Sequence, residues 1–259
     1  MKLSIYQIDA FAEKIFQGNS AAICPLDEWL PDDVLQNIAQ ENNLSETAYF
    51  IKEGDGYRIR WFTPTVEVDL CGHATLACAY VIFEILGLEN DAILFHSKSG
   101  ELKVTRKGDL IELDFPKSTI SKCEIPPEIT KAFGKKPLEV WRSDDYIAVY
   151  ANEADIVSLS PDFNILSQLE CRGVIATSRG EETDFVSRFF APRYGINEDP
   201  VTGSAHCELM PYWARELGKN KLSAAQLSKR GGRLQCELAG ERVLISGCAV
   251  KYLEGTIEI

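Results

Sequence analysis

The feature that most limits the possible folds of this chain is a weak internal repeat with a period of about 130 residues. Residues 60–64, RWFTP, match residues 188–192, RFFAP, and residues 72–74 match residues 203–205. Three further pairs follow in the same order: Leu86-Gly87 with Leu217-Gly218, residues 97–100 with 228–231, and Gly108-Asp109 with Gly240-Glu241. The offset grows from 128 to 132 residues along the chain, as loop insertions would cause. Solenoid repeats are far shorter, so we expect two domains of similar fold, residues 1–118 and 119–259.

The two copies show the same succession of predicted elements. In the first, the sequence predicts strands at 3–9, 47–52, 57–63 and within 92–115, with helices at 31–42 and 72–86. The helix at 72–86 carries only one charge, Glu84, and is therefore expected to be buried on nearly all sides. The second copy repeats this order around a helix that begins at Gly203. We therefore predict an α+β fold in which mostly antiparallel strands are wrapped around one central helix, twice.

Charge and composition exclude several classes of function. The chain has 259 residues, of which 45% are apolar, and 27 Lys+Arg against 39 Asp+Glu give a net charge of -12. An acidic chain repels phosphate backbones, so we expect neither nucleic acid nor a membrane as partner. Asp9 and Glu13 interrupt any signal-peptide core, and the eight cysteines include no CxxC pair. We therefore expect reduced thiols and a cytoplasmic location.

Both predicted central helices begin at a glycine that follows an irregular segment, at Gly72 and at Gly203. The free N–H groups and the positive dipole end of a helix N-terminus attract anions. Related domains would direct both helix starts into a shared cleft, where they suit a substrate carboxylate or a developing enolate oxygen. The alternative is that the two glycines serve only the close packing of buried helices.

Three side chains near these helix starts are candidates for acid/base chemistry. Glu46 precedes an apolar strand, and the repeat aligns it with Val174, so only one copy carries a carboxylate there. His73 follows the first helix glycine, and Asp199 precedes the start of the second helix. Each also has a structural interpretation: a solvated strand end for Glu46, a packed side chain for His73 and a turn or cap residue for Asp199.

Recognised motifs for metals and cofactors are not found in the sequence. Dinucleotide, P-loop and GxSxG patterns are missing. Soft metal ligands are present, but their spacings match no zinc motif: Cys71, His73, Cys78, His206 and Cys207. We therefore expect no metal and no cofactor.

Five segments together resemble the phenazine-biosynthesis PhzF-like family. They are Gly18-Asn19, residues 42–47 (NNLSET), 62–64 (FTP), 69–75 (DLCGHAT) and 198–206 (EDPVTGSAH). The resemblance extends from residue 7 to about residue 247. It implies the diaminopimelate-epimerase fold, in which two pseudo-symmetric barrels with central helices face one cleft.

The same resemblance implies a cofactor-free isomerase that moves a proton between carbons of a small, carboxylated metabolite. Its catalytic glutamate corresponds to Glu46, the histidine of its GH motif to His73, and the aspartate of its DPxTGS motif to Asp199. Substrate binding is expected at Asn19, Ser45, Gly72, Gly203 and Ser204. We expect the active form to be a homodimer.

Two alternatives stay open at this point. Diaminopimelate epimerase, a more distant relative, uses one cysteine from each domain as its acid/base pair. Cys71 lies near the first of these positions, which leaves an epimerase or racemase using Cys71 as one alternative, although the second copy offers Asp199 and no thiol. The other alternative is a non-catalytic binding or regulatory protein on the same fold.

Overall fold

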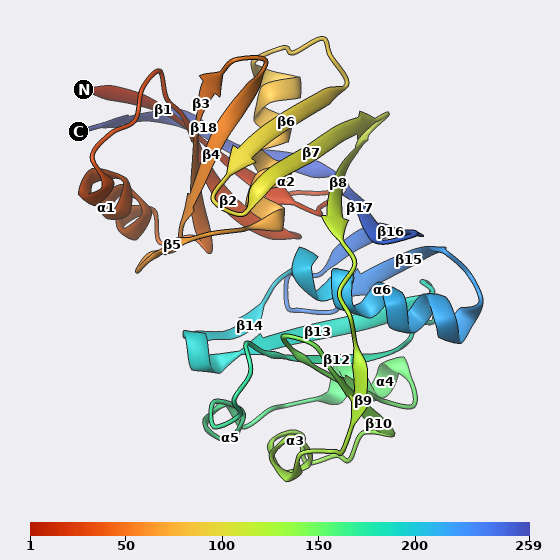
Figure 1. Ribbon diagram of the computed structural model, residues 1–259. Helices are drawn as coiled ribbons and strands as arrows, with labels where there is room; N and C mark the ends of the chain where they lie inside the picture. The colour runs from red at the N-terminus through yellow and green to blue at the C-terminus, as the bar shows by residue number, and fades with distance from the viewer. The chain divides into compact units, whose positions relative to one another are not determined.

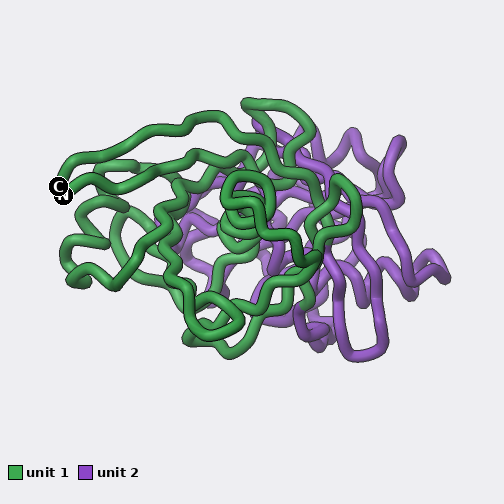
Figure 2. The backbone as a smooth tube through the Cα atoms, turned by 90° about the horizontal axis from the view of Figure 1, so that it is seen from above, with its two compact units in different colours: residues 1–114, 246–259 green, residues 115–245 purple.

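A computed structural model describes all 259 residues, which form two compact units (Figure 2). Unit 1 comprises residues 1–114 and 246–259, and unit 2 comprises residues 115–245. The expected division at residue 118 differs from this at the C-terminus. The last strand, β18 (Ala249–Glu258), pairs antiparallel with the first, β1 (Lys2–Ala10), and therefore belongs to unit 1. The two chain ends lie side by side (Figure 1), and the Ile259 N–H donates to the Met1 carbonyl at 2.9 Å.

Unit 1 is one sheet with a helix on either face. Its strands pair in the order β18–β1–β2–β3–β4–β6–β7–β8, and β5 adds to β4. Only β2–β3 and β4–β6 are parallel, and each of these pairs is joined by a helical crossover, as parallel neighbours require. The remaining elements of the unit are β2 (Asn19–Pro25), α1 (Asp32–Asn42), β3 (Glu46–Glu53), β4 (Gly56–Phe62), β5 (Glu67–Val68), α2 (Gly72–Tyr80), η1 (Val81–Ile85), β6 (Ala92–Ser97), β7 (Gly100–Lys107) and β8 (Leu110–Pro116).

Unit 2 repeats this pairing pattern over seven strands, which correspond to β18 through β7 of unit 1. Its order is β9–β10–β11–β12–β13–β15–β16, with β14 added to β13 and with β11–β12 and β13–β15 as the parallel pairs. The predicted duplication is therefore present in the topology of the two sheets. Its elements are β9 (Ser121–Cys123), α3 (Pro127–Phe133), β10 (Glu139–Arg142), β11 (Tyr146–Val149), α4 (Glu153–Ser158), α5 (Phe163–Leu166), β12 (Val174–Arg179), β13 (Phe185–Ala191), η2 (Pro192–Tyr194), β14 (Ile196–Asp199), α6 (Gly203–Leu217), β15 (Lys221–Gln226), β16 (Gly232–Ala239) and β17 (Arg242–Gly247).

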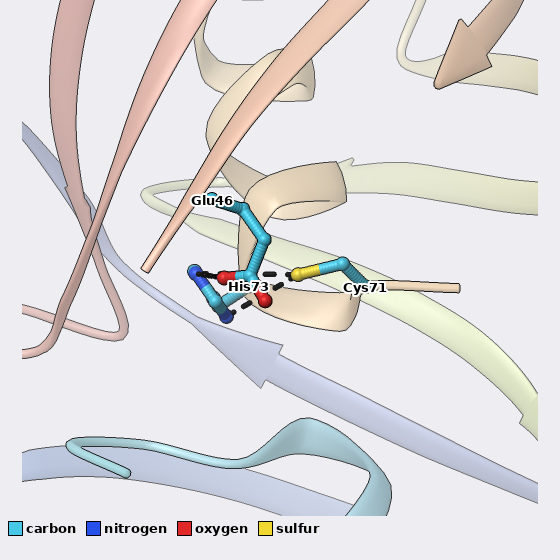
Figure 3. Close-up of side chains that lie close together, drawn as sticks. All are labelled: Glu46, Cys71 and His73. Carbon is cyan, nitrogen blue, oxygen red and sulfur yellow. Dashed lines mark hydrogen bonds and ion pairs between the residues drawn. The ribbon is translucent and has the colours of Figure 1, made fainter. Parts of the chain in front are cut away.

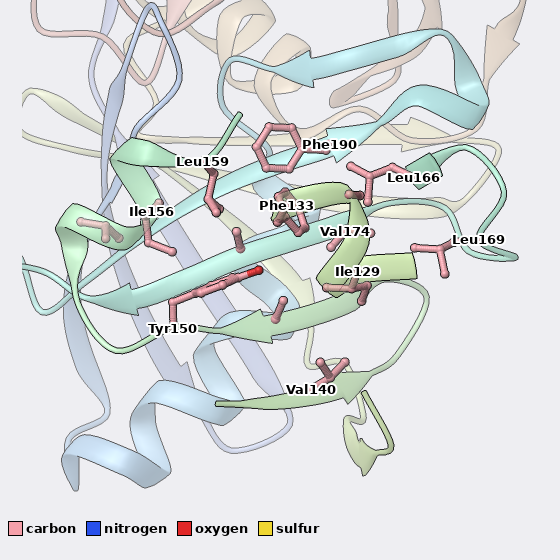
Figure 4. Packing of buried hydrophobic residues seen from close by; sticks show 14 of the residues in the cluster. Ile129, Phe133, Val140, Tyr150, Ile156, Leu159, Leu166, Leu169, Val174 and Phe190 are labelled. Carbon is pink, nitrogen blue, oxygen red and sulfur yellow. The ribbon is translucent and has the colours of Figure 1, made fainter. Parts of the chain in front are cut away.

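The two faces of the unit 2 sheet bury different helices. Val186 and Phe190 of β13 pack with α3, α4 and α5 in one apolar cluster, which includes Phe133 (Figure 4). Phe185 of the same strand instead stacks on Trp213 of α6, with ring centroids 5.7 Å apart. Since successive side chains of a strand point to opposite faces, α6 covers the face opposite to α3, α4 and α5. In unit 1, α1 packs in a corresponding cluster with Tyr49.

Helix α2 is buried on all sides, as the scarcity of charge in its sequence predicts. Residues 73–79 are all buried, and the small side chains of Ala74, Ala77 and Ala79 allow the strands to approach closely. The helix predicted over 72–86 ends earlier, because the backbone widens into the π-helical turn η1, where the Leu86 N–H donates to the Val81 carbonyl at 2.9 Å. None of the helices combines the length and the apolar character needed to cross a membrane.

Candidate active site

The parallel pairing of β2 with β3 brings the starts of both strands to the N-terminus of α2. Ala21 lies opposite Glu46 in this pair, so Asn19, the first residue of β2, and Glu46, the first residue of β3, lie at the same edge of the sheet. Asn19 and Glu46 both contact His73 in the first turn of α2. Three segments far apart in sequence therefore contribute side chains to one cluster.

Local sequence places these side chains. Helix α1 is followed by Asn43, whose left-handed conformation (φ 47°) turns the chain toward β3, and asparagine tolerates this conformation well. The Asn42 amide donates to the Thr47 hydroxyl at 3.0 Å and fixes the turn around Glu46. Gly18 sets the start of β2: its φ is +66°, and a Cβ there would lie 2.1 Å from the Ala10 carbonyl oxygen, so only glycine fits.

Glu46 and His73 form a largely buried pair (Figure 3). Glu46 Oε2 lies 3.0 Å from His73 Nε2, and the side chains are 13% and 7% exposed. This is an ion-pair contact without hydrogen-bond alignment, so the buried Oε2 atom has no hydrogen-bond partner. A buried carboxylate that is held by a cation, yet keeps a free lone pair, is suited to accept a proton.

The other ring nitrogen of His73 faces a short polar chain. The Asn19 amide nitrogen lies 3.3 Å from His73 Nδ1, and the Ser45 hydroxyl donates to the Asn19 amide oxygen at 3.0 Å. A hydroxyl can donate or accept, and an amide can present either end. The Ser45–Asn19 chain can therefore follow a change in the protonation state of His73.

Cys71 completes the cluster from the residue that precedes α2. Its sulfur lies 3.5 Å from His73 Nδ1. Burial, and secondarily the Glu46 carboxylate, raise the pKa of the Cys71 thiol to about 11, so it is neutral at pH 7. Burial by itself would lower the pKa of His73, but Cys71 and Glu46 outweigh it and hold that pKa well above 6.5.

The same three side chains could together hold a metal ion. Glu46, Cys71 and His73 each offer one ligand atom, and these three atoms lie within 4.8 Å of one another. Tetrahedral zinc accepts these ligand types. However, a bound metal would occupy the carboxylate lone pair and deprotonate the thiol, so metal binding and proton transfer by Glu46 are competing uses of this cluster.

In unit 2, Asp199 ends β14 and is anchored by the loop that leads into α6. The Thr202 hydroxyl donates to Asp199 Oδ2 at 2.5 Å. The fully buried Gln226 donates to the Asp199 carbonyl at 2.9 Å and to the Thr202 hydroxyl at 3.1 Å, and it accepts from the Thr202 N–H at 2.9 Å. The loop and the Asp199 carboxylate are thus fixed from β15.

The start of α6 carries the two remaining expected residues. Gly203 and Ser204 form its first turn, and no side chain caps this N-terminus. The Ser204 hydroxyl accepts a hydrogen bond of 2.8 Å from Arg172, whose guanidinium is paired with Asp145. His206, one turn further on, is fully buried, and burial lowers its pKa to about 4. It is therefore a neutral packed residue.

The expected site residues thus fall into two sets, one in each unit. Asn19, Ser45, Glu46, Gly72 and His73 surround the start of α2, and Asp199, Gly203 and Ser204 surround the start of α6. Sequence reasoning missed Arg172, Asp145 and Gln226, because none lies in a motif. Their one available signal is position, since Asp145 directly precedes β11 and Arg172 lies two residues before β12.

The alignment of Glu46 with Val174 is corrected by strand register. Thr47 lies opposite Phe62 in unit 1, and Val174 lies opposite Phe190 in unit 2. Since Phe62 and Phe190 are equivalent in the repeat, Val174 corresponds to Thr47, and the residue equivalent to Glu46 is the glycine before Val174. The earlier inference remains, because only unit 1 has a carboxylate at this position.

Comparisons with known proteins agree on one family. A family model described as phenazine biosynthesis-like protein matches residues 8–255. A relative from Pseudomonas aeruginosa, named an uncharacterized isomerase, is 53% identical over 259 residues, and the alignment covers 100% of both chains. The crystal structure of a PhzF family protein from Enterococcus faecalis is 47% identical, with a TM-score of 0.98 over 100% of both chains.

A more distant structure shares the fold alone. It is a hydroxyproline epimerase from Agrobacterium vitis, at 10% identity, with a TM-score of 0.63 over 99% of this chain and 92% of that one. The predicted α+β fold class and the predicted isomerase type are therefore confirmed. By its sequence and its fold, the chain belongs to the phenazine biosynthesis-like PhzF family.

Proposed function

We propose that this protein is a cofactor-independent isomerase in which Glu46 removes a proton from one carbon of a small carboxylated metabolite and a proton is returned at another carbon. The observation that carries the proposal is the buried Glu46–His73 pair, with its ion-pair contact of 3.0 Å and a carboxylate oxygen that makes no hydrogen bond. A carboxylate oxygen that is buried and not used in a hydrogen bond can accept an incoming proton.

Glu46 is a better base than Cys71, the alternative in the same cluster. A thiol must be deprotonated to act as a base, and burial beside the Glu46 carboxylate raises the Cys71 pKa to about 11. The start of α6 offers no second thiol either, because Cys207 lies a full turn into that helix and its thiol faces the Gly203 carbonyl. These two points support Glu46 against a racemase with two cysteines.

The negative charge that develops on the substrate needs a stabilising partner, because carbon acids ionise poorly in water. The N-terminus of α2 has no side-chain cap, so the N–H groups around Gly72 are available as donors. His73, whose pKa the neighbouring Cys71 and Glu46 raise against burial, lies in the same first turn. We assign the role of an oxyanion-type donor set to this helix start.

The return of the proton is assigned to protonated Glu46 or to Asp199. Asp199 suits an acid/base role because the Thr202 hydroxyl and the Gln226 amide fix its geometry. Since side chains carry the proton throughout, the proposed reaction requires no cofactor. The substrate carbon must be acidified by a neighbouring carbonyl, carboxylate or conjugated double bond.

The test is proton exchange with solvent. Wild-type protein is incubated in D₂O with a panel of small carboxylic acids, including trans-4-hydroxy-L-proline, the ligand named for the Agrobacterium vitis epimerase. Mass spectrometry then detects compounds that gain deuterium. We expect Glu46→Gln to slow exchange into any such compound about 10²- to 10⁴-fold, the usual contribution of positioned acid/base catalysis.

Glu41→Gln is the matched control, because Glu41 is an exposed glutamate on α1 and should leave exchange unchanged. Wild-type exchange rates in Glu46→Gln would refute the assignment of the base and make Asp199 the leading candidate. Tight binding of panel compounds by the wild type without any exchange would instead identify a binding protein.

A further inference from the structure

The segments that precede β11 and β12 occupy in unit 2 the place that Asn19 and Ser45-Glu46 occupy in unit 1. β11 and β12 are parallel, with Tyr146 opposite Val174, and the Tyr146 N–H donates to the Gly173 carbonyl at 3.0 Å. This register brings Asp145 and Arg172 to one edge of the sheet. The hydrogen bond from Arg172 to Ser204 shows that α6 begins at the same edge. The repeated frame therefore places a guanidinium where unit 1 places its acid/base cluster.

Arg172 is held rigidly by a buried partner. Asp145 is fully buried and receives two hydrogen bonds from the guanidinium, one from Nε to Oδ1 at 3.0 Å and one from Nη2 to Oδ2. The guanidinium also lies over the Phe189 ring, 5.5 Å from its centroid. The Arg172 side chain nevertheless stays 37% exposed. Since a buried ion pair adds little stability of its own, a fixed, partly exposed guanidinium at this edge indicates a role toward something outside the core.

The direction of the Arg172–Ser204 hydrogen bond determines where the serine proton points. Arg172 Nη1 lies 2.8 Å from Ser204 Oγ, and a guanidinium has no acceptor atom, so the serine oxygen must accept. The single hydrogen of the Ser204 hydroxyl therefore points away from Arg172. Ser204 itself stands in the first turn of α6, whose N-terminus has no side-chain cap. A free hydroxyl donor in an uncapped first turn suits a carboxylate, which only accepts.

We propose that Arg172, anchored by Asp145, is a positioning residue that sets the Ser204 hydroxyl as a donor to a carboxylate group of the substrate. The carboxylate class of the substrate rests on the proposed function. Arg172 acts through Ser204 in two ways: it fixes the orientation of the hydroxyl, and its positive charge polarises the O–H bond toward the ligand.

A double-mutant cycle tests this coupling. Itaconate, a dicarboxylate with a conjugated carbon–carbon double bond, is the probe, and its dissociation constant is measured by isothermal titration calorimetry. We expect Arg172→Lys and Ser204→Ala each to weaken binding about 10- to 100-fold, the range for losing one hydrogen bond to a charged group. Because Arg172 acts on the ligand only through the Ser204 hydroxyl, the double variant should bind as Ser204→Ala does, within about threefold.

Arg142→Lys is the matched control, since Arg142 on β10 bonds the Tyr146 hydroxyl and the Glu170 carbonyl, and should leave binding unchanged. If lysine at 172 disturbs folding, Arg172→Ala with Asp145→Asn repeats the cycle without an unpaired buried charge. Losses that multiply in the double variant, or a wild type that does not bind itaconate, would overturn the proposal. This test measures binding, whereas the isomerase proposal is tested by deuterium exchange. A failure of that proposal, seen as wild-type exchange rates in Glu46→Gln, is therefore recognised separately.

Discussion

Glu208 gives the sharpest test of the electrostatics of unit 2, because it is a buried acid with little to hold its charge. It lies on α6 and is 2% exposed; its Oε1 atom is 3.7 Å from Arg172 Nη2, and its Oε2 atom has no hydrogen-bond partner. Burial, and then the nearby Asp145, raise its pKa from 4.5 to about 8, although Arg172 opposes this. Glu208 is therefore protonated in the folded protein at neutral pH.

The sign of the effect on stability follows from this raised pKa. Below pH 4.5 the carboxyl is protonated in both the folded and the unfolded chain. Between pH 4.5 and about 8 the folded chain keeps a proton that the unfolded chain has released, so the free energy of unfolding falls as pH rises. One proton contributes about 1.4 kcal/mol per pH unit, so this group removes up to about 5 kcal/mol across the interval.

Glu208→Gln removes this titration and keeps the shape of the side chain. We expect the variant and the wild type to differ by about 1 kcal/mol or less at pH 5. The variant should then become progressively more stable than the wild type as the pH is raised to 8. Guanidinium denaturation at several pH values, followed by tryptophan fluorescence, measures the difference.

Glu216→Gln on α6 is the matched control, because Glu216 is 41% exposed and pairs with Arg215 at the surface. Its stability difference from the wild type should not change with pH by more than a few tenths of a kcal/mol. A stability difference for Glu208→Gln that stays constant from pH 5 to 8 would refute the reasoning, because it would mean that Glu208 is ionised in the folded protein.

Three further predictions follow from individual contacts. Tyr49→Phe removes the hydrogen bond of 2.8 Å to the Leu35 carbonyl that joins β3 to α1, and urea denaturation should show a loss of about 1 kcal/mol. Imidazole NMR signals should show His206 neutral from pH 5 to 8, because burial lowers its pKa to about 4, while His73 stays protonated well above pH 6.5; a titration of His206 near pH 6.5 would contradict its burial. Deletion of residues 249–259 should leave the β1 edge unpaired and make unit 1 sensitive to limited proteolysis while unit 2 persists, and equal resistance of both units would show that β18 is dispensable.

The duplication and its two central helices could be predicted from sequence because the information is local and occurs twice. RWFTP and RFFAP mark equivalent strands, and the glycines at 72 and 203 mark equivalent helix starts, so each copy supports the interpretation of the other. The near absence of charge in the first helix likewise predicts its burial, since no side of it could face water.

What could not be predicted depends on contacts between distant segments. The pairing of β18 with β1 joins the two ends of the chain, and no sequence pattern within β18 indicates which strand it pairs with. Strand register cannot be read from the sequence either, because the local sequence is the same in any register. A shift of one residue moved the equivalent of Glu46 from Val174 to Gly173. The pairing of Asp145 with Arg172 depends on that same register and was missed for the same reason.

The repeated frame explains why the two helix starts carry different chemistry. In unit 1 the residue at the start of β3 is Glu46, whereas in unit 2 the equivalent residue is Gly173. A Cβ at Gly173 would lie 2.5 Å from the Phe189 ring and 2.9 Å from the Phe190 carbonyl oxygen. Unit 2 therefore cannot carry a second carboxylate at this position unless the Phe189 ring moves. The neighbouring Arg172 places a guanidinium there instead, hydrogen-bonded to Ser204. Packing around Gly173 thus confines this carboxylate to one copy, which agrees with the proposal that Glu46 is the base.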